Sequence, residues 1–266
     1  MKIPSYFKFL CVVGFLLGIP SCQPDPFLPC EENVHLSGLL CKKIIVQNGK
    51  PAGYVKFVYN DNTQVYLEKY IDPKENSQGN LFRYYTSRRL DSTCFWNEEE
   101  KLLEKRINRY NEIDSLVSDT RIFFQNNGYQ NEQQTYFYSK KLDSIQVFLN
   151  GSLVKTKRYF FYNNSNLLYK ILFFNPAFQL DSQSVFSSSA DGFLIERKLD
   201  PYGKKLGQIT RKANANGQLV YEEILGLNNI LLQRTDFILD NSGKVVKKFF
   251  TRPNSSLDNF EQFYYY

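Results

Sequence analysis

A two-strand unit that recurs along the chain is the feature that most limits how this sequence can fold. Its clearest copies lie between Thr135 and Phe174, where apolar-rich runs end on an aromatic residue and a short polar stretch precedes the next run. This pattern is typical of a β-hairpin. The residues that close the first strand of each copy are Tyr59, Tyr85, Tyr110, Tyr138, Tyr162, Ser189, Ala213 and Leu239. Their spacing of 24 to 28 residues predicts about eight hairpin repeats of ~26 residues.

The polar stretches between the runs carry turn signals. Asn-Gly pairs occur at 48–49, 127–128 and 150–151, and Asn-Gly supplies the positive φ that tight hairpin turns need. Two strands and two turns per repeat give roughly sixteen strands, with short ones at the ends. We predict a mainly β fold, an antiparallel meander over residues 42–266. Because strand twist accumulates, such a meander must curl, split into two packed layers or close, and we expect a curled or rolled sheet.

Two segments are informative about this prediction. Residues 97–117 also fit a helix, because Asn97 suits a helix cap and apolar residues recur at helical spacing. They fit the repeat in register as well, and we predict strands there. Leu167–Phe174 is apolar on both faces of a strand except at Lys170, which predicts cover on both sides. We therefore expect the middle of the array to be its best-buried part.

Composition agrees with a β fold and excludes some functions. The 23 Phe and 19 Tyr favour strands, where flat side chains pack on a pleated face. The mean hydropathy of −0.42 excludes a bundle of membrane helices. The formal net charge is +6, but Lys and Arg are scattered and form no long basic run. This distribution predicts a solvated β surface and no nucleic-acid partner.

Residues 1–21 have the pattern of a signal peptide. Two lysines accompany an apolar run, Phe9–Ile19, that is too short to span a bilayer as a mature helix. The run ends in residues 19–22 (IPSC), which resemble a bacterial lipobox with Pro20 as its unusual member. We predict cleavage before Cys22 and a lipid on its thiol, so that the chain sits on the membrane. An ordinary secretory signal and an uncleaved anchor are the alternatives.

The residues after Cys22 predict a tether and a location. Gln23, rather than Asp, follows the cysteine, and by resemblance to the sorting rule of enteric bacteria this predicts the outer membrane. Which side of that membrane the chain faces is not readable from the sequence. Residues 22–41 form the predicted tether, with three prolines near its start.

Three cysteines would remain beside the lipidated one, an odd number for an oxidising compartment. Cys30 and Cys41 are close enough in sequence to form a disulfide that fastens the tether to the first strand, while Cys94 is left over. Neither a C-x-x-C pair nor a His pair occurs, so we predict no metal site. We expect the only histidine, His35, to lie on the surface.

The hairpin unit resembles the tyrosine-aspartate (YD) repeats of the RHS type, which carry Y-D-x-x-G-x-L at the turn. Residues 162–167 read YNNSNL, residues 214–219 read NANGQL and residues 239–243 read LDNSG. The resemblance extends from about Lys42 to the end of the chain, and it implies a curled β-sheet shell. The overall pattern is also similar to that of β-repeat lipoproteins of Bacteroidota.

Three Asp-Ser pairs place Ser92, Ser115 and Ser144 in a D-S/T-x pattern. This pattern resembles the O-glycosylation acceptor of exported Bacteroidota proteins. The alternative is that Asp and Ser recur at the start of repeat strands because short polar side chains bond to the turn backbone.

The sequence carries no constellation that predicts catalysis. The acidic runs Glu98–Glu100 and Glu222–Glu223 fit a solvated face better than a pair of catalytic carboxylates. There is no G-x-S-x-G elbow and no phosphate-binding loop, and any Ser-His-Asp triad would depend on His35. We predict no enzyme and no cofactor.

We therefore expect an outer-membrane lipoprotein with a binding or scaffolding role in the cell envelope, without catalysis. Its partners would be the membrane, through the lipid, and a protein or glycan ligand. Aromatic rows on a sheet can stack on sugars or peptides, so an accessory protein that captures either for an uptake system is the alternative. A hydrolase with an unrecognised cleft is the second alternative.

Overall fold

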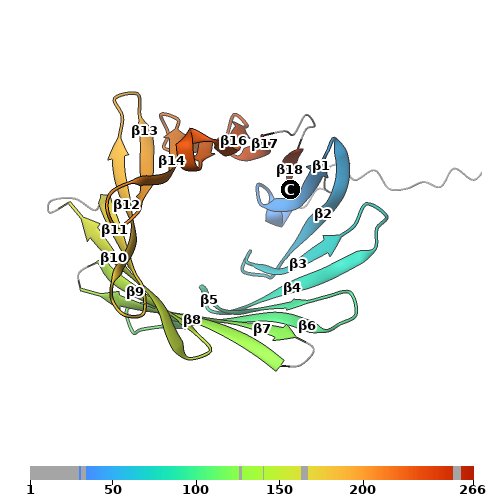
Figure 1. Ribbon diagram of the computed structural model, residues 1–266. Helices are drawn as coiled ribbons and strands as arrows, with labels where there is room; N and C mark the ends of the chain where they lie inside the picture. The colour runs from blue at the N-terminus through green and yellow to red at the C-terminus, as the bar shows by residue number, and fades with distance from the viewer. Residues whose placement is uncertain (1–29, 31–33, 126–127, 140, 163–166, 254–258) are drawn as a thin grey trace, which may run out of the picture.

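The computed structural model describes residues 30, 34–125, 128–139, 141–162, 167–253 and 259–266. In this part of the chain, 18 antiparallel strands form one sheet. Each strand pairs with the next and β18 pairs with β1, so the sheet closes into a barrel (Figure 1).

The first nine strands are β1 (Leu40–Gln47), β2 (Lys50–Tyr59), β3 (Val65–Ile71), β4 (Ser77–Thr86), β5 (Arg89–Trp96), β6 (Leu102–Tyr110), β7 (Leu116–Gln125), β8 (Gly128–Tyr138) and β9 (Leu142–Leu149). The others are β10 (Ser152–Phe161), β11 (Leu168–Phe174), β12 (Leu180–Ser188), β13 (Phe193–Leu199), β14 (Lys205–Ala213), β15 (Leu219–Leu225), β16 (Leu231–Leu239), β17 (Val245–Thr251) and β18 (Asn259–Tyr265). Two short 3-10 helices, η1 (Val34–Leu36) and η2 (Leu227–Asn229), complete the described elements.

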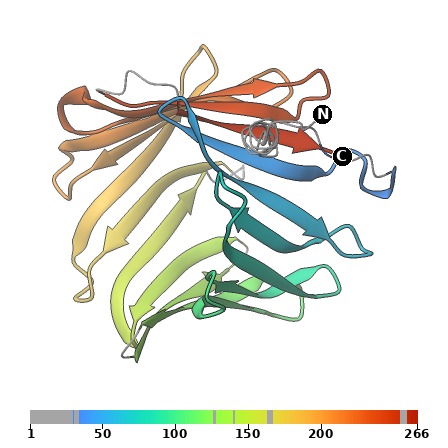
Figure 2. The same ribbon diagram turned by 90° about the vertical axis from the view of Figure 1, so that its right-hand side faces the viewer.

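Closure corrects the expectation of a curled or rolled sheet. The aromatic C-terminal segment forms β18, which lies beside β1 in Figures 1 and 2. Along this seam Ile44 is paired with Gln262 and Val46 with Phe260, and Lys43 Nζ lies 3.1 Å from Glu261 Oε1. An open sheet would leave the backbone groups of both edge strands unpaired, and the β1–β18 ladder removes both edges.

The turn residues explain the N/D-x-x-G signal of the sequence. In the turn before β17 the Asp240 N–H donates to the Lys244 carbonyl (2.9 Å) and the Gly243 N–H donates to the Asp240 carbonyl (3.0 Å). The Asp240 side chain accepts two further backbone N–H groups. Gly243 has φ +84°, which suits a residue without Cβ. Turns with the same two backbone bonds start at Asn60, Asp72, Asn97, Asn111, Asn175, Ser189, Asp200 and Asn214.

The aromatic residues that mark the predicted repeat lie at strand ends and hold two strands together. Each repeat-closing position falls within one residue of the end of an even-numbered strand. The Tyr59 hydroxyl at the end of β2 donates to the Leu40 carbonyl at the start of β1 (2.6 Å). The same bond joins Tyr85 to Val65, Tyr110 to Leu90, Tyr138 to Leu116 and Tyr265 to Val245. These tyrosines therefore fasten the open end of a hairpin.

All these bonds lie at one end of the barrel, which we call the first rim, where odd-numbered strands begin. The chain enters and leaves the barrel at this rim. The Gly38 N–H donates to the Tyr266 carbonyl (2.8 Å), and the Tyr266 N–H donates to the Leu39 carbonyl (2.9 Å). The second rim, where odd-numbered strands end, carries the turn at Asn48 and lies opposite.

Two other expectations have opposite outcomes. Residues 97–117 form a turn, β6 and the start of β7, so the prediction of strands is confirmed. The prediction that the middle of the array is best buried is wrong, because every residue of β11 is only half-buried. The best-buried cluster contains Ile44, Val46 and Tyr54 near the seam. None of the described residues covers β11 as a second layer in this hollow barrel, whereas at the seam Ile71, Phe260 and Tyr264 pack against the buried cluster.

Candidate binding site inside the barrel

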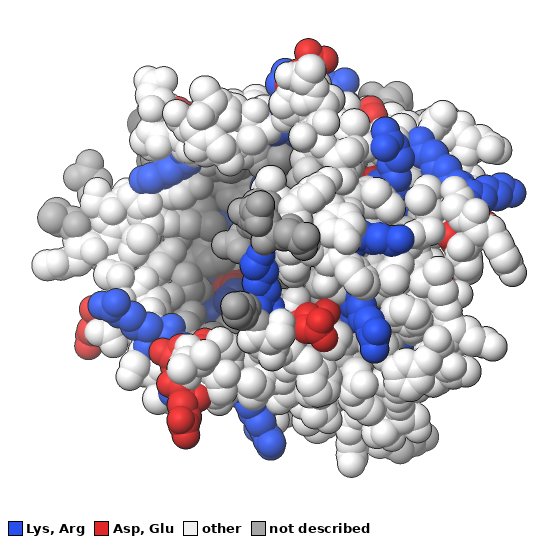
Figure 3. Space-filling view, turned by 90° about the vertical axis from the view of Figure 1, so that its left-hand side faces the viewer, with Lys and Arg blue, Asp and Glu red and all other residues white. Residues whose placement is uncertain are grey.

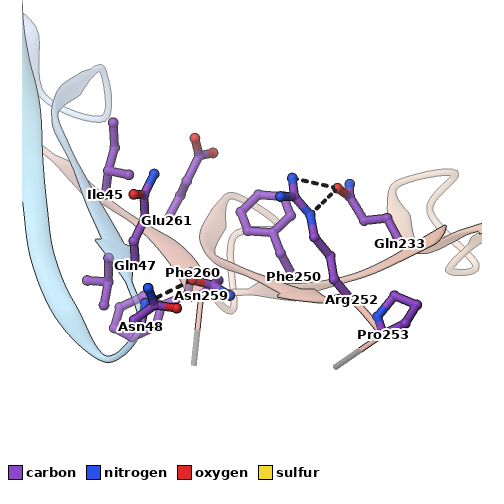
Figure 4. Close-up of a pocket in the computed structure, with 11 residues that line it drawn as sticks. Ile45, Gln47, Asn48, Gln233, Phe250, Arg252, Pro253, Asn259, Phe260 and Glu261 are labelled. Atoms are coloured by element: carbon purple, nitrogen blue, oxygen red, sulfur yellow. Dashed lines mark hydrogen bonds between the residues drawn. The ribbon is translucent and has the colours of Figure 1, made fainter. Parts of the chain in front are cut away.

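The two faces of the sheet can be assigned from one cavity. Successive residues of a strand point to opposite faces. Ile45, Gln233, Phe250 and Glu261 come from β1, β16, β17 and β18, and they line a cavity of about 500 Å³ (Figure 4). Side chains from four successive strands converge only on the concave side of a curved sheet. We therefore call these residues and their cross-strand partners the inner face, and residues in register with Ile44 the outer face.

The inner face carries charged clusters in which carboxylates meet basic side chains. The most buried is centred on Asp119, which is 3 % exposed. Asp119 Oδ2 accepts hydrogen bonds from Arg106 Nη2 and from the Tyr136 hydroxyl, both at 2.9 Å. Burial, and next the bond to Asp119, raise the pKa of Tyr136. The raised pKa keeps a proton on the Tyr136 hydroxyl, which donates to Asp119.

A second cluster, on β3 and β4, is built in the same way. Glu68 accepts hydrogen bonds from the Arg83 guanidinium and from the Tyr70 hydroxyl (3.0 Å). Burial, and then the charge of Glu68, raise the pKa of Tyr70 to about 12. The Tyr70 ring meets the Phe95 ring edge to face, with centroids 5.6 Å apart. The ring contact passes over Gly79, which lies opposite Tyr70 and has no side chain to separate the rings.

In two more clusters, one charged side chain lies between two side chains of opposite charge. Arg211 lies between Glu222 (Nε–Oε2 2.7 Å) and Glu196 (Nη1–Oε2 3.6 Å). Glu261 lies between Lys43 (3.1 Å) and Lys248 (3.9 Å). Glu222 was expected on a solvated face, and the structure instead places it inside the barrel as a partner of Arg211. In these clusters the carboxylates are engaged by basic groups.

The cavity of Figure 4 combines an aromatic ring with hydrogen-bonding groups at the second rim. Arg252 donates to the Gln233 side-chain oxygen from Nε (3.3 Å) and Nη2 (3.2 Å), and the Arg252 guanidinium lies beside the Phe250 ring. Asn259 Oδ1 accepts the Asn48 N–H (2.9 Å). An apolar surface with a few convergent polar groups suits a ligand that has both characters.

Sequence reasoning missed these cavity residues. Gln233, Phe250, Arg252 and Asn259 form no motif, because alternation sends every second residue of a strand to the other face and the cavity draws on strands far apart in sequence. The space-filling view shows how open the barrel is, with a deep hollow bordered by Lys and Arg side chains (Figure 3).

The predicted N-terminal features meet the structure only in part. The signal peptide and Cys22 lie outside the described residues. The structure pairs the sulfur atoms of Cys30 and Cys41, whose Cα atoms are 6.4 Å apart. The disulfide remains a prediction, and an intact mass showing three free thiols would contradict it. His35 is exposed. The remaining cysteine, Cys94, is buried, and this burial raises the pKa of its thiol.

The three predicted acceptor serines do not share one environment. Ser92 on β5 and Ser144 on β9 are paired strand residues, and the preceding aspartates, Asp91 and Asp143, occupy the extra position of a β-bulge. Ser115 instead lies in a turn, where its N–H donates to Asn111 Oδ1 (2.9 Å). The bulge gives the recurrence of Asp-Ser at strand starts a structural reason, and the glycosylation of these serines stays a prediction.

Metal and membrane features are limited in the described part of the chain. These residues contain no group of three or more His, Cys, Asp or Glu side chains that could hold a metal ion. Nor do they include a helix with the length and apolar character needed to span a bilayer.

Comparison with known proteins gives structural neighbours only. No protein-family model matches the sequence, and a search of curated proteins found no match. Solved structures include porin-like proteins from Bacteroides uniformis (9 % identity, TM-score 0.46, 86 % of this chain and 99 % of that chain) and Bacteroides vulgatus (9 %, 0.41, 85 % and 98 %). The TcdB2-TccC3 structure matches at 10 % identity and TM-score 0.34, where 80 % of this chain spans 16 % of the other. Similarities this low support no argument about function.

Proposed function

We propose that this chain is a non-catalytic binding protein of the outer membrane, anchored by a lipid on Cys22, whose hollow barrel captures a glycan or a peptide. The cavity lined by Gln233, Phe250, Arg252 and Asn259 carries this proposal. Its guanidinium and amides can bond to hydroxyl or peptide groups, while the Phe250 ring offers an apolar surface for a sugar ring or a side chain.

The inner face supports capture over pure scaffolding. Aromatic side chains recur on it around the barrel, on paired positions of many strands: Phe57, Tyr70, Phe95, Phe123, Tyr136, Tyr159, Phe173, Phe186, Phe237, Phe250 and Phe263. A concave, aromatic-lined and partly charged surface suits a ligand that enters the hollow. In the clusters around Asp119, Glu68 and Arg211, Arg side chains engage the carboxylates, an arrangement that suits charge pairing better than the general acid of a glycosidase, which needs a raised pKa.

Charges on both faces favour a barrel that stands in water at the membrane surface. Lys56, Lys105 and Arg197 occupy paired outer-face positions within their strands. A membrane-spanning barrel presents an apolar band on its outside, where Lys or Arg costs about 2–4 kcal/mol at the bilayer midplane. These positions therefore fit an aqueous surface and a lipid tether better than a lipid-facing wall.

The tether would also orient the cavity. Cys22 and Cys30 are eight residues apart in sequence, a span of at most about 28 Å when extended. The first rim, where the tether joins β1, would then lie next to the membrane. The cavity lies at the second rim, so its mouth would face away from the bilayer.

The capture proposal is tested by screening the purified full chain against glycan and peptide arrays and measuring the affinity of any hit by calorimetry. We expect Phe250→Ala with Arg252→Ala to weaken binding by about tenfold or more, because the variant loses the ring and a charged donor. Arg158→Ala, on the outer face, is the matched control. A hit that binds the double variant as tightly as the parent would exclude the cavity as its site.

The location is tested by protease treatment of intact cells beside a Cys22→Ala control. Digestion of the parent chain in intact cells would place the barrel outside, and survival until the outer membrane is broken would place it in the periplasm. A Cys22→Ala chain that stays in the membrane fraction would contradict the lipid anchor.

A further inference from the structure

A row of three lysines crosses β1, β2 and β3 on the outer face. Lys42 lies directly opposite Lys56, and Lys56 lies directly opposite Lys69. Like charges at directly opposed positions of a sheet destabilise it. The alternation of residues between the two faces of the sheet requires only polar side chains at these outer positions. It does not require that all three be lysines.

Aromatic rings draw two of the ammonium groups together. Lys42 Nζ and Lys56 Nζ lie 5.9 Å and 5.5 Å from the centroid of the same Tyr54 ring, and Lys42 Nζ is also 5.1 Å from the centre of the Tyr264 ring. Cation–π contacts of this kind hold an ammonium group without neutralising its charge. Lys42 is only 9 % exposed, so the accessible charge of this pair is that of Lys56.

A groove adjoins this row. It encloses a volume of about 430 Å³ between β3 and β4, and Lys69 lies on its wall. Its other lining residues are apolar (Leu67, Ile71 and Phe82) or polar (Glu75, Ser77 and Asn80). The carboxylate of Glu75 accepts a hydrogen bond from the Tyr54 hydroxyl, which ties the groove to the lysine row. Lys56 and Lys69 are exposed, so a ligand can reach both.

We propose that this patch binds an anionic saccharide, with its acidic group at Lys56 and Lys69 and its ring in the groove. Two lysines supply charge-assisted hydrogen bonds to a carboxylate, sulfate or phosphate. Phe82, Leu67 and Ile71 offer an apolar floor for a sugar ring, and Asn80 and Ser77 can bond to its hydroxyl groups. The site lies on the opposite face from the cavity of the proposed function and does not depend on it. The saccharide can be a free polymer or the head of a membrane lipid.

The test measures binding of the purified full chain to immobilised polygalacturonate, with neutral dextran as reference. We expect binding to polygalacturonate that weakens as salt is added, and none to dextran. Lys56→Gln with Lys69→Gln should lower the affinity by about tenfold or more, because two charged contacts are lost. Lys69→Arg, which keeps the charge, should retain binding.

The matched control is Lys170→Gln with Arg197→Gln, which removes two positive charges from the outer face of β11 and β13. It should leave the affinity within about twofold, because these residues lie away from the groove. An equal loss of affinity in both double variants would mean that only the net charge matters, and it would overturn the site. Equal binding to dextran and to polygalacturonate would also overturn it, and so would an unchanged affinity in Lys56→Gln with Lys69→Gln.

A second arm distinguishes the two sources of saccharide. Phosphatidylcholine vesicles with and without lipopolysaccharide compete against the polygalacturonate surface. Stronger competition by the lipopolysaccharide vesicles supports a lipid-linked ligand, and stronger competition by free polygalacturonate supports a free polymer. Binding to neither probe would overturn the proposal.

Discussion

The two faces of this barrel use charge in opposite ways. On the inner face, acids and bases are mixed and paired, as in the clusters around Asp119, Glu68 and Arg211. The outer-face ladder positions carry Lys42, Lys56, Lys69, Lys105, Arg109, Arg158, Lys170, Arg197, Lys212, Arg234 and Lys247, against the acids Glu223 and Asp236. The outer wall is thus strongly basic, whereas the lumen mixes its acids with bases that include Lys155, Lys157 and Lys198. Alternation along each strand is enough to separate them.

The largest contrast should appear when one carboxylate is removed from each face. Asp119→Ala removes a buried carboxylate that accepts hydrogen bonds from Arg106 and from the half-buried Tyr136, and we expect a loss of about 2–3 kcal/mol in the free energy of unfolding. Asp236→Ala breaks the exposed pair with Arg234 and should cost less than about 1 kcal/mol. Urea titrations of both variants measure the difference. Equal losses would mean that the inner clusters are no better sheltered from water than the outer ones.

A somewhat smaller effect is expected from a methyl group added to the inner face. Gly79 has φ +138°, and a Cβ there would lie 2.5 Å from the Trp96 carbonyl oxygen and 2.9 Å from the Phe95 ring. Gly79→Ala should therefore cost about 2 kcal/mol. Gly151→Ala, at a turn with φ +81° and no atom within 4 Å of the new Cβ, should cost about 1 kcal/mol. Thermal unfolding of the two variants compares packing strain with backbone strain alone.

The smallest effect concerns alkaline pH. The folded chain holds the Tyr70 proton up to a pKa of about 12, whereas the unfolded chain releases it near 10. The unfolded state therefore binds fewer protons between these values, so this contribution to stability is complete below pH 10 and is lost as the pH rises to 12. Tyr70→Phe, which cannot ionise, should flatten part of the fall in melting temperature over that range. An unchanged slope would show that Tyr70 is not held in its protonated form by the inner face.

Local features of this fold were readable from the sequence, and long-range ones were not. The strand ends at Tyr59, Tyr85 and Tyr110 and the turn at Asp240 depend on neighbouring residues, so spacing and turn chemistry predicted them. Closure depends on pairs such as Val46 with Phe260, which are more than 200 residues apart. No local pattern specifies that the last strand meets the first.

The candidate sites were hidden for a related reason. Alternation indicates which residues share a face, but only the direction of curl decides which face is inside. Phe250 and Arg252 therefore could not be assigned to a lumen. The lysine row needs the register of three strands, because Lys42, Lys56 and Lys69 have no common spacing in the sequence.

The seam between β1 and β18 has a kinetic consequence. Contacts between neighbouring strands are local and can form as the chain becomes available, but β1 cannot complete its pairing until residues 259–265 are present. Until then both edges of a long sheet are open to pairing with other chains, which is the usual route to aggregation. We expect the final closing step to limit the folding rate, because it alone joins the two ends of the sheet across the largest loop. A barrel of this kind is exposed to misassembly for as long as its last seven-residue strand is missing.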